Sequence, residues 1–219
     1  MSITQPRVNT RLPWVCSVIA ATIFWTALLA FGNLRADYSQ LTKAVSELGA
    51  IGAPHALAWN VLGFIAPGLL LAASALAIAT AVDGRGGVLR WLLTGSGLAF
   101  AGTGVFPAVM QYGSPVMQAP TTIGHVVMLL LSSILWLVAM AVLLRKITRE
   151  PHLRRLLTPF VVVTSIAVVG LAANVLHDAI PPLEHRPGLA QRFGFGGYFL
   201  WFVSLSLWIR EINGTKGRP

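Results

Sequence analysis

Six long runs of apolar residues dominate the sequence, and their length constrains the fold more than any other feature. A helix needs about 20 apolar residues to cross the hydrocarbon core of a bilayer, and each run comes close to that length. The strands of a membrane β-barrel would instead alternate over segments of about ten residues, and these runs do not alternate. The runs cover residues 14–31, 59–82, 91–110, 125–144, 158–176 and 193–209.

We therefore predict an all-α, polytopic integral membrane protein, with a single domain of six transmembrane helices over residues 1–219. The composition agrees, because charged residues make up 11% of the chain whereas soluble domains carry about 25%. Much of the surface must then face lipid. The expected helices cover about residues 14–32, 58–82, 91–110, 124–144, 157–176 and 192–210.

The positions of Lys and Arg predict the orientation. If the N-terminus is cytoplasmic, twelve of the sixteen Lys and Arg residues fall on inside segments. The positive-inside rule then places both termini in the cytoplasm and the chain in the plasma membrane. The net charge of +9 follows from this topology and from attraction to anionic lipid. We expect membrane lipids as partners and no nucleic acid.

The first outside loop has a helical pattern of its own. Its spacing of three and four residues between apolar positions predicts a short amphipathic helix over 38–48 that lies at the membrane interface. Asp37 or Ser39 can cap the start of this helix, and Gly49 fits its end. The apolar positions are Leu41, Ala44, Val45 and Leu48.

The outside ends of the predicted helices carry many of the ionisable and amide side chains of this apolar chain. Polar groups near membrane segments are costly and usually face the bundle interior or a wet cavity. We therefore predict one outward-facing polar pocket that binds or processes a lipid or isoprenoid, with Glu47 and His125 as its catalytic residues. The predicted substrate-binding residues are Ser46, Asn60, His177, Asp178 and Arg192.

Glu47 is the most informative member of this set. In the last turn of the expected interfacial helix, its carboxylate would meet the negative end of the helix dipole. Either Arg192 compensates it in a structural ion pair, or Glu47 serves as a general acid or base. Arg192 could alternatively hold an anionic headgroup, and Asn60 could orient the ligand through its amide.

Histidine placement supports a polar pocket better than a metal site. His125 opens the fourth helix, where the helix dipole favours a neutral imidazole that can act as a base or as a structural hydrogen-bond partner. His177 and Asp178 are adjacent and point in different directions on a helix, although Asn174 can share a face with them. The spacing typical of catalytic zinc is missing from the sequence. We predict no metal and no cofactor.

An ordered set of motifs resembles a bacterial and archaeal family, the domain of unknown function 998. The motifs are "SELGA" at 46–50, "AWN" ending at Asn60, "GVFP" at 104–107, His125, and "GLAQRFGFGGYFLW" at 188–201. The resemblance runs through essentially the whole chain and implies a compact six-helix membrane protein without an established activity. By position, the motif residues are Ser46, Glu47, Gly49, Asn60, Phe106, Pro107, His125 and Arg192.

Two classes of function remain open at the level of sequence. The first is an enzyme or binder that acts on a lipid. The second is a non-enzymatic role as a small transporter, a sensor or a membrane assembly partner. The sequence has no evident internal repeat, and its ionisable groups lie at one end of the helices, whereas transporters usually show repeats and midplane sites.

Overall fold

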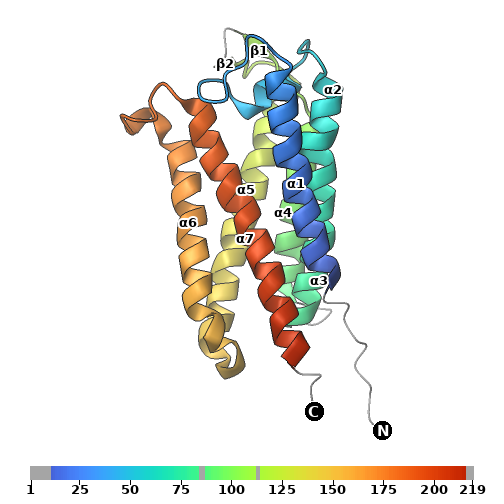
Figure 1. Cartoon of the computed structure of the whole chain (residues 1–219), viewed down its shortest axis with the longest axis vertical. Helices are drawn as coiled ribbons and strands as arrows, with labels where there is room; N and C mark the ends of the chain where they lie inside the picture. Colours follow the sequence, from blue (N-terminus) through green and yellow to red (C-terminus); the bar gives the residue numbers. More distant parts are fainter. Residues whose placement is uncertain (1–10, 84–86, 112–113, 216–219) are drawn as a thin grey trace.

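Six long helical rods run side by side around one hydrophobic core (Figure 1). A computed structural model describes residues 11–83, 87–111 and 114–215. Within these ranges the rods are α1 (Arg11–Asn33), α2–η2–α3 (Ala56–Trp59, Asn60–Ile65, Ala66–Asp83), α4 (Val88–Val105), α5 (Pro120–Arg149), α6 (Leu157–Val175) and α7 (Pro187–Thr215). The prediction of an all-α membrane helix bundle is confirmed.

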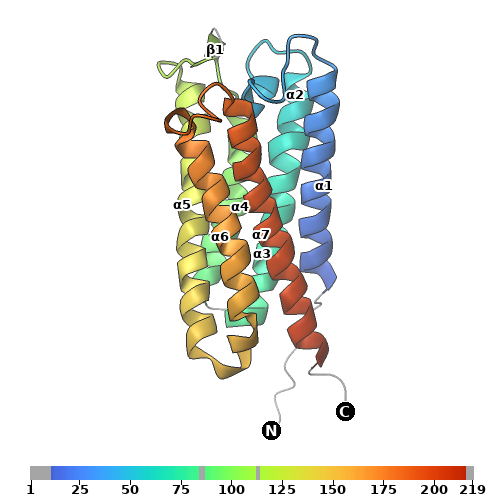
Figure 2. The same ribbon diagram turned by 60° about the vertical axis from the view of Figure 1, so that its left-hand side comes forward.

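Four described segments are long and apolar enough to cross a membrane: Leu12–Asn33, Ala56–Val82, Pro120–Arg149 and Leu153–Val175. The other two rods, α4 and α7, stand among them in the bundle (Figure 2). Both carry several glycines and polar side chains. The described residues form six long helices, but that all six cross the membrane stays a prediction.

Short elements cover one end of the bundle, which we call the capped end. It is defined by η1 (Val45–Gly49), the hairpin of β1 (Met110–Gln111) and β2 (Ser114–Pro115), and η5 (His177–Ala179). The hairpin is antiparallel, and Met110 pairs with Pro115. At the opposite end α1 begins, α7 ends, and η4 (Pro151–Leu156) joins α5 to α6 (Figures 1 and 2).

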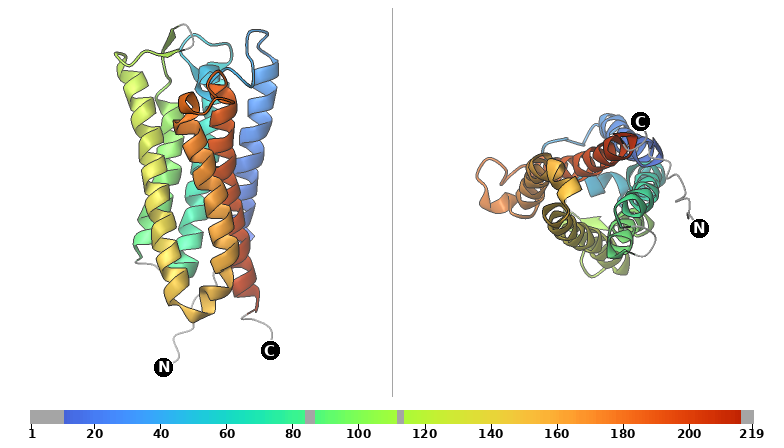
Figure 3. Two further views of the ribbon diagram at one scale, coloured as in Figure 1. Left: turned by 90° about the vertical axis from the view of Figure 1, so that its left-hand side faces the viewer. Right: turned by 90° about the horizontal axis from the view of Figure 1, so that it is seen from below.

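Seen along its axis, the bundle is a ring in the order α1, α3, α4, α5, α6, α7 (Figure 3). Three neighbouring pairs pack closely along their lengths: α3 with α4, α4 with α5, and α6 with α7. The contact between α5 and α6 is the smallest between neighbours in the ring. The bundle therefore has one loose seam.

Small residues set the closest approach of α3 and α4. A Cβ added to Gly97 would lie 2.6 Å from the backbone nitrogen of Ala72, and one added to Gly68 would meet the backbone of Ala101. On each helix, a glycine and an alanine are four residues apart, and each glycine contacts the alanine of the other helix. Such small-residue faces let helices pack backbone to backbone in lipid.

The second rod changes its pitch beside a proline. In η2 the helix is of the π type, and the Ala66 N–H donates to Val61 O, five residues back. Pro67 follows directly and has no N–H to donate. A π-turn accommodates the missing bond without breaking the rod, and such turns are frequent at functional sites.

Several helix ends differ from the sequence-based boundaries by three to five residues, and prolines explain two of these differences. The third helix stops at Val105, not near residue 110, because Phe106 precedes Pro107 and takes a non-helical conformation (φ −110°, ψ 82°). The last helix begins at Pro187, earlier than the predicted 192, because proline suits the first helical position.

The predicted interfacial α-helix over 38–48 is wrong. Residues 34–44 form turns, and a short 3-10 helix follows over Val45–Gly49. An isolated helix of this length is marginal, and bonds from α7 to this segment hold its backbone in another shape. Ser39 does cap, but it caps a turn: its Oγ accepts from the N–H groups of Leu41 and Thr42, each at 3.3 Å.

Candidate functional site

The loose seam contains a cavity of about 390 Å³ between α5, α6 and α7. Its walls are mainly apolar, with Phe64, Phe100 and Phe195 at the back and leucines of α5 and α6 at the sides. A few polar side chains interrupt the apolar lining: Ser46, Ser132, Ser133, Asn174, Gln191 and Tyr198. All of these are uncharged at neutral pH.

The cavity opens through the side of the bundle. Leu130 and Ile134 line it and are each 56% exposed, and Val175 lines it and is 69% exposed. The two α5 residues belong to a segment apolar enough to cross a membrane. In a bilayer, the opening would therefore face lipid chains.

Three polar side chains form a collar where the cavity meets the capped end. Gln191 Oε1 accepts from the Val45 N–H at 2.7 Å, which ties α7 to the start of η1. The Ser46 hydroxyl, the Asn174 amide and the Gln191 Nε2 group have no hydrogen-bond partner among the described residues. Their donors and acceptors are available to a bound molecule.

A cluster of three hydroxyls lies deeper in the cavity, on α4, α5 and α7. Ser96 Oγ donates to Ser132 O at 3.0 Å and lies 3.0 Å from Tyr198 OH. Ser132 Oγ lies 3.4 Å from both of the other hydroxyl oxygens. Ser132 and Tyr198 line the cavity, and Ser96 stands behind them.

Glu47 has a structural environment at the N-terminus of η1. Its Oε1 accepts from the Ala44 N–H at 3.0 Å, and its Oε2 lies 3.3 Å from Lys43 Nζ. This is half of a capping box, in which a carboxylate satisfies a free backbone donor. Because Glu47 lies in the first turn of η1, the helix dipole stabilises its carboxylate, the opposite of the effect expected from the sequence. Lys43, and not Arg192, is the cation beside Glu47.

We expect Glu47→Gln to change the free energy of unfolding by less than about 1 kcal/mol. The Gln oxygen keeps the bond from the Ala44 N–H, and only a partly exposed ion pair with Lys43 is lost. Glu47→Ala should cost about 1–2 kcal/mol, because it leaves a backbone donor unsatisfied. Thermal unfolding in detergent measures both, and equal losses would mean that the ion pair is the important contact.

Arg192 ties α7 to the loop between α1 and η1. Its Nη2 donates to Tyr38 OH at 3.0 Å, its Nη1 donates to Gly188 O at 2.6 Å and Lys43 O at 3.4 Å, and its Nε donates to Gln40 Oε1 at 3.1 Å. Nη2 also donates to the same Gln40 oxygen. All five guanidinium N–H groups are used, so an anionic headgroup would have to displace one of these acceptors.

Charges on the loop itself also shape its conformation. Arg35 donates to both carboxylate oxygens of Asp37, at 3.2 and 2.7 Å, and its hydrogen bond holds the pKa of Asp37 below its usual range. Arg35 also donates to Glu47 O at 3.0 Å. Burial raises the pKa of the Tyr38 phenol, although the neighbouring Arg192 acts in the opposite direction. Tyr38 is thus held as a neutral phenol that bridges Arg192 and Ala44 O.

His125 closes the end of α4. Its Nδ1 lies 3.0 Å from both Thr103 O and Phe106 O, so Nδ1 must carry the proton. The last carbonyls of a helix lack intrahelical partners, and His125 supplies one for α4. Its Nε2 is buried and has no partner among the described residues. The neighbouring Thr122 Oγ1 accepts from the Val109 N–H at 2.9 Å.

Asn60 closes the turn that follows η1. Its Nδ2 donates to Gly49 O at 2.9 Å, and a side chain at Gly49 would collide with Asn60 and Trp59. This contact joins two of the motifs that carry the family resemblance. The contact between His125 Nδ1 and Phe106 O joins the "GVFP" motif to His125 in the same way. The motif residues therefore hold the capped end together.

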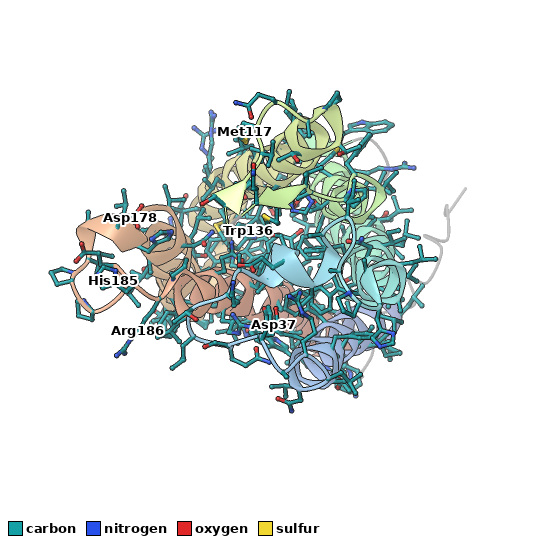
Figure 4. All side chains as sticks on the ribbon, turned by 90° about the horizontal axis from the view of Figure 1, so that it is seen from above. Asp37, Met117, Trp136, Asp178, His185 and Arg186 are labelled. Carbon is teal, nitrogen blue, oxygen red and sulfur yellow. The ribbon has the colours of Figure 1, made fainter. Side chains whose placement is uncertain are left out.

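His177 and Asp178 lie away from the cavity. Both belong to η5, on a lobe that projects from the bundle together with His185 and Arg186 (Figure 4). His177 Nδ1 is 2.8 Å from Asp178 Oδ1, and the Asp178 side chain is 85% exposed. The pair is a solvent-facing contact, and neither residue lines the cavity.

The seven predicted site residues do not meet in one pocket. Of them, only Ser46 lines the cavity. Glu47, Asn60, His125 and Arg192 do lie at the capped end, as expected, but each is engaged in its own backbone contacts. Arg192 also borders a separate groove on the outer face of α6 and α7. Within the described residues, no group of three or more His, Cys, Asp or Glu side chains could hold a metal ion.

Apart from Ser46, sequence reasoning missed the polar residues that line the cavity. Ser132, Ser133 and Tyr198 interrupt apolar runs, and Asn174 and Gln191 stand near the ends of such runs. A hydroxyl or amide in an otherwise apolar membrane helix is the signal that could have found them, because such groups usually face the bundle interior.

Comparison with known proteins gives one match. The family described as "Protein of unknown function (DUF998)" matches residues 18–208. No curated protein and no solved structure matches the chain.

Proposed function

This chain belongs to the DUF998 family, and on that premise we propose that it binds an uncharged membrane lipid in the cavity between α5, α6 and α7. The observation that carries the proposal is the lateral opening of an apolar cavity within a membrane-crossing segment. A volume of about 390 Å³ falls in the range of about 300–1,000 Å³ that is usual for ligand pockets.

The polar lining supports an uncharged ligand. The collar of Ser46, Asn174 and Gln191 offers hydroxyl and amide groups, which suit a hydroxyl or an ester carbonyl. Arg192 and Lys43, the nearby cations, are engaged with the first outside loop. A charged headgroup would thus find fewer favourable interactions at this collar than an uncharged one.

Binding, and not catalysis by Glu47 and His125, is the function proposed. Neither residue lines the cavity, and the described contacts of both are structural. The alternative roles as a transporter, sensor or assembly partner have no comparable observation in their favour. A lipid-binding protein could still serve as a sensor, with lipid occupancy as its signal.

We also propose that the capped end faces outward in the plasma membrane and that both termini are cytoplasmic. The basic residues of the α5–α6 connection, Arg145, Lys146, Arg149, Arg154 and Arg155, support this orientation under the positive-inside rule. The collar would then lie near the headgroups of the outer leaflet.

Filling the cavity tests the proposal. Val126 lines it, whereas the next residue, Val127, is exposed on another face of α5. We expect Val126→Trp to lower the amount of lipid that co-purifies with the protein about tenfold, equivalent to ~1.4 kcal/mol of binding. Val127→Trp should leave that amount unchanged. Quantitative mass spectrometry of lipid extracted from the purified protein gives the measurement, and equal lipid content in the two variants would refute the proposal.

A further inference from the structure

Within the hydroxyl cluster of the cavity, the Ser132 hydroxyl has only long contacts. Ser96 gives its only hydroxyl hydrogen to Ser132 O at 3.0 Å, so its oxygen is an acceptor. Tyr198 OH, at 3.0 Å, is the donor that fits this acceptor. The Ser132 hydroxyl is left with contacts of 3.4 Å only, well beyond the 2.7–2.8 Å or so that is usual for O–H···O bonds.

A second donor lies one turn further along α5. Trp136 also lines the cavity, it is 1% exposed, and its Nε1–H is buried without a hydrogen-bond partner among the described residues. Its ring contacts Tyr198 edge to face, with 4.9 Å between the centroids. Ser132 and Trp136 are four residues apart and therefore share a helix face. Both are donors.

A donor without a partner, or with only long contacts, lowers the stability of a protein in a membrane. Water is not available inside the hydrocarbon region, and a buried polar group without a partner costs up to several kcal/mol. An acceptor atom of a bound molecule could accept from these two donors and so remove the cost, whereas an apolar chain alone could not.

We infer that the ligand carries an acceptor oxygen within its apolar body, placed to accept from the Ser132 hydroxyl and the Trp136 indole. Tyr198 follows Gln191 by seven residues on α7, so the cluster lies about 10 Å below the collar. The ligand class is thus an uncharged lipid with a carbonyl, ether or hydroxyl oxygen about two helical turns below its polar end. This inference rests on the proposed lipid-binding function.

Neighbouring serines provide a matched pair of variants. Ser132→Ala removes the donor that has only long contacts but keeps the bond from Ser96, because that bond goes to the backbone oxygen. Ser133 lines the same cavity, but its hydroxyl already donates to Leu129 O at 2.9 Å. Ser133→Ala therefore removes a hydroxyl of the same kind that has no free hydrogen for a ligand.

The experiment compares two probes that differ by one oxygen. One is a long-chain alcohol with a ketone in the middle of its chain, and the other is the same alcohol without the ketone. Binding of each to the purified full chain in detergent is measured by native mass spectrometry. The wild-type protein and Ser133→Ala should prefer the keto alcohol about tenfold, the effect of one hydrogen bond. Ser132→Ala should lose the preference, and Trp136→Phe should reduce it.

Each outcome has one reading. The inference fails if wild type binds both alcohols equally, or if Ser132→Ala keeps the preference of wild type. If neither alcohol binds and Val126→Trp retains its lipid, the lipid-binding function itself is refuted. Equal thermal unfolding of Ser132→Ala and Ser133→Ala shows that a lost preference does not reflect a lost fold.

Discussion

Gly97→Ala is expected to destabilise the bundle by about 3 kcal/mol, the upper part of the range for overpacked cores. The added methyl group would lie 2.6 Å from Ala72 N and 2.9 Å from Ala72 Cα. These are backbone atoms of α3 and cannot move aside as the tip of a side chain can. Helices α3 and α4 would have to separate along the face where they pack most closely.

Gly95→Ala on the same helix is the control. Its new methyl group would meet only Leu135 Cδ1, at 3.0 Å, the end of a flexible side chain. Alanine also favours the helix over glycine by about 1 kcal/mol. Gly95→Ala should therefore leave the free energy of unfolding unchanged or raise it slightly, whereas Gly97→Ala should lower it. Thermal unfolding in detergent measures both, and a neutral Gly97→Ala would show that the packing of α3 on α4 is looser than described.

Arg192→Met is expected to cost about 3 kcal/mol, since hydrogen bonds to charged groups contribute about 1.5–3 kcal/mol. The substitution removes every bond from the guanidinium to Tyr38, Gln40 and Lys43, and it leaves Gln40 Oε1 without a donor among the described residues. The segment that follows α1 should then exchange its backbone hydrogens faster over residues 38–49. Hydrogen exchange with mass spectrometry resolves this segment from the rest of the chain.

Two further variants define the role of Arg192. Arg192→Lys should lose nearly as much stability, because a lysine ammonium cannot reproduce the planar fork that reaches several acceptors at once. Arg186→Met serves as the control, since Arg186 is exposed on the η5 lobe. If Arg192→Lys retained full stability, positive charge and not geometry would hold the loop. The cavity collar should also loosen in Arg192→Met, because Ser46 follows the released segment.

Local sequence patterns predicted the long helices well but failed for the interfacial helix, and the structure shows why. Apolar runs and prolines located the long helices, since both act within the helix itself. The interfacial helix failed because Arg192 and Gln191, about 150 residues away in sequence, hold residues 38–45 in turns. The expected effect of the helix dipole on Glu47 was wrong for the same reason, because its sign depends on where the helix begins.

The candidate site shows the same division. His125 was expected to be a neutral imidazole at a helix start, and a neutral ring with its proton on Nδ1 accounts for a buried Nε2 that has no partner among the described residues. Which carbonyls it meets depends on how α4 and α5 pack. The polar side chains in apolar helices could have indicated some of the residues that line the cavity, but its position and size could not be found from the sequence. Both result from the poor fit between α5 and α6.

By itself, the sequence determined that this protein is a bundle of apolar helices, and it determined the family. Both follow from residue types and short-range spacing: lipid selects long apolar helices whatever their neighbours are, and the motifs are ordered along the chain. Only the tertiary structure decided that Glu47, His125 and Arg192 hold the capped end together and that Ser132, Trp136 and Tyr198 line a cavity. Those roles depend on distances between side chains of different helices, and the packing of the whole bundle sets these distances.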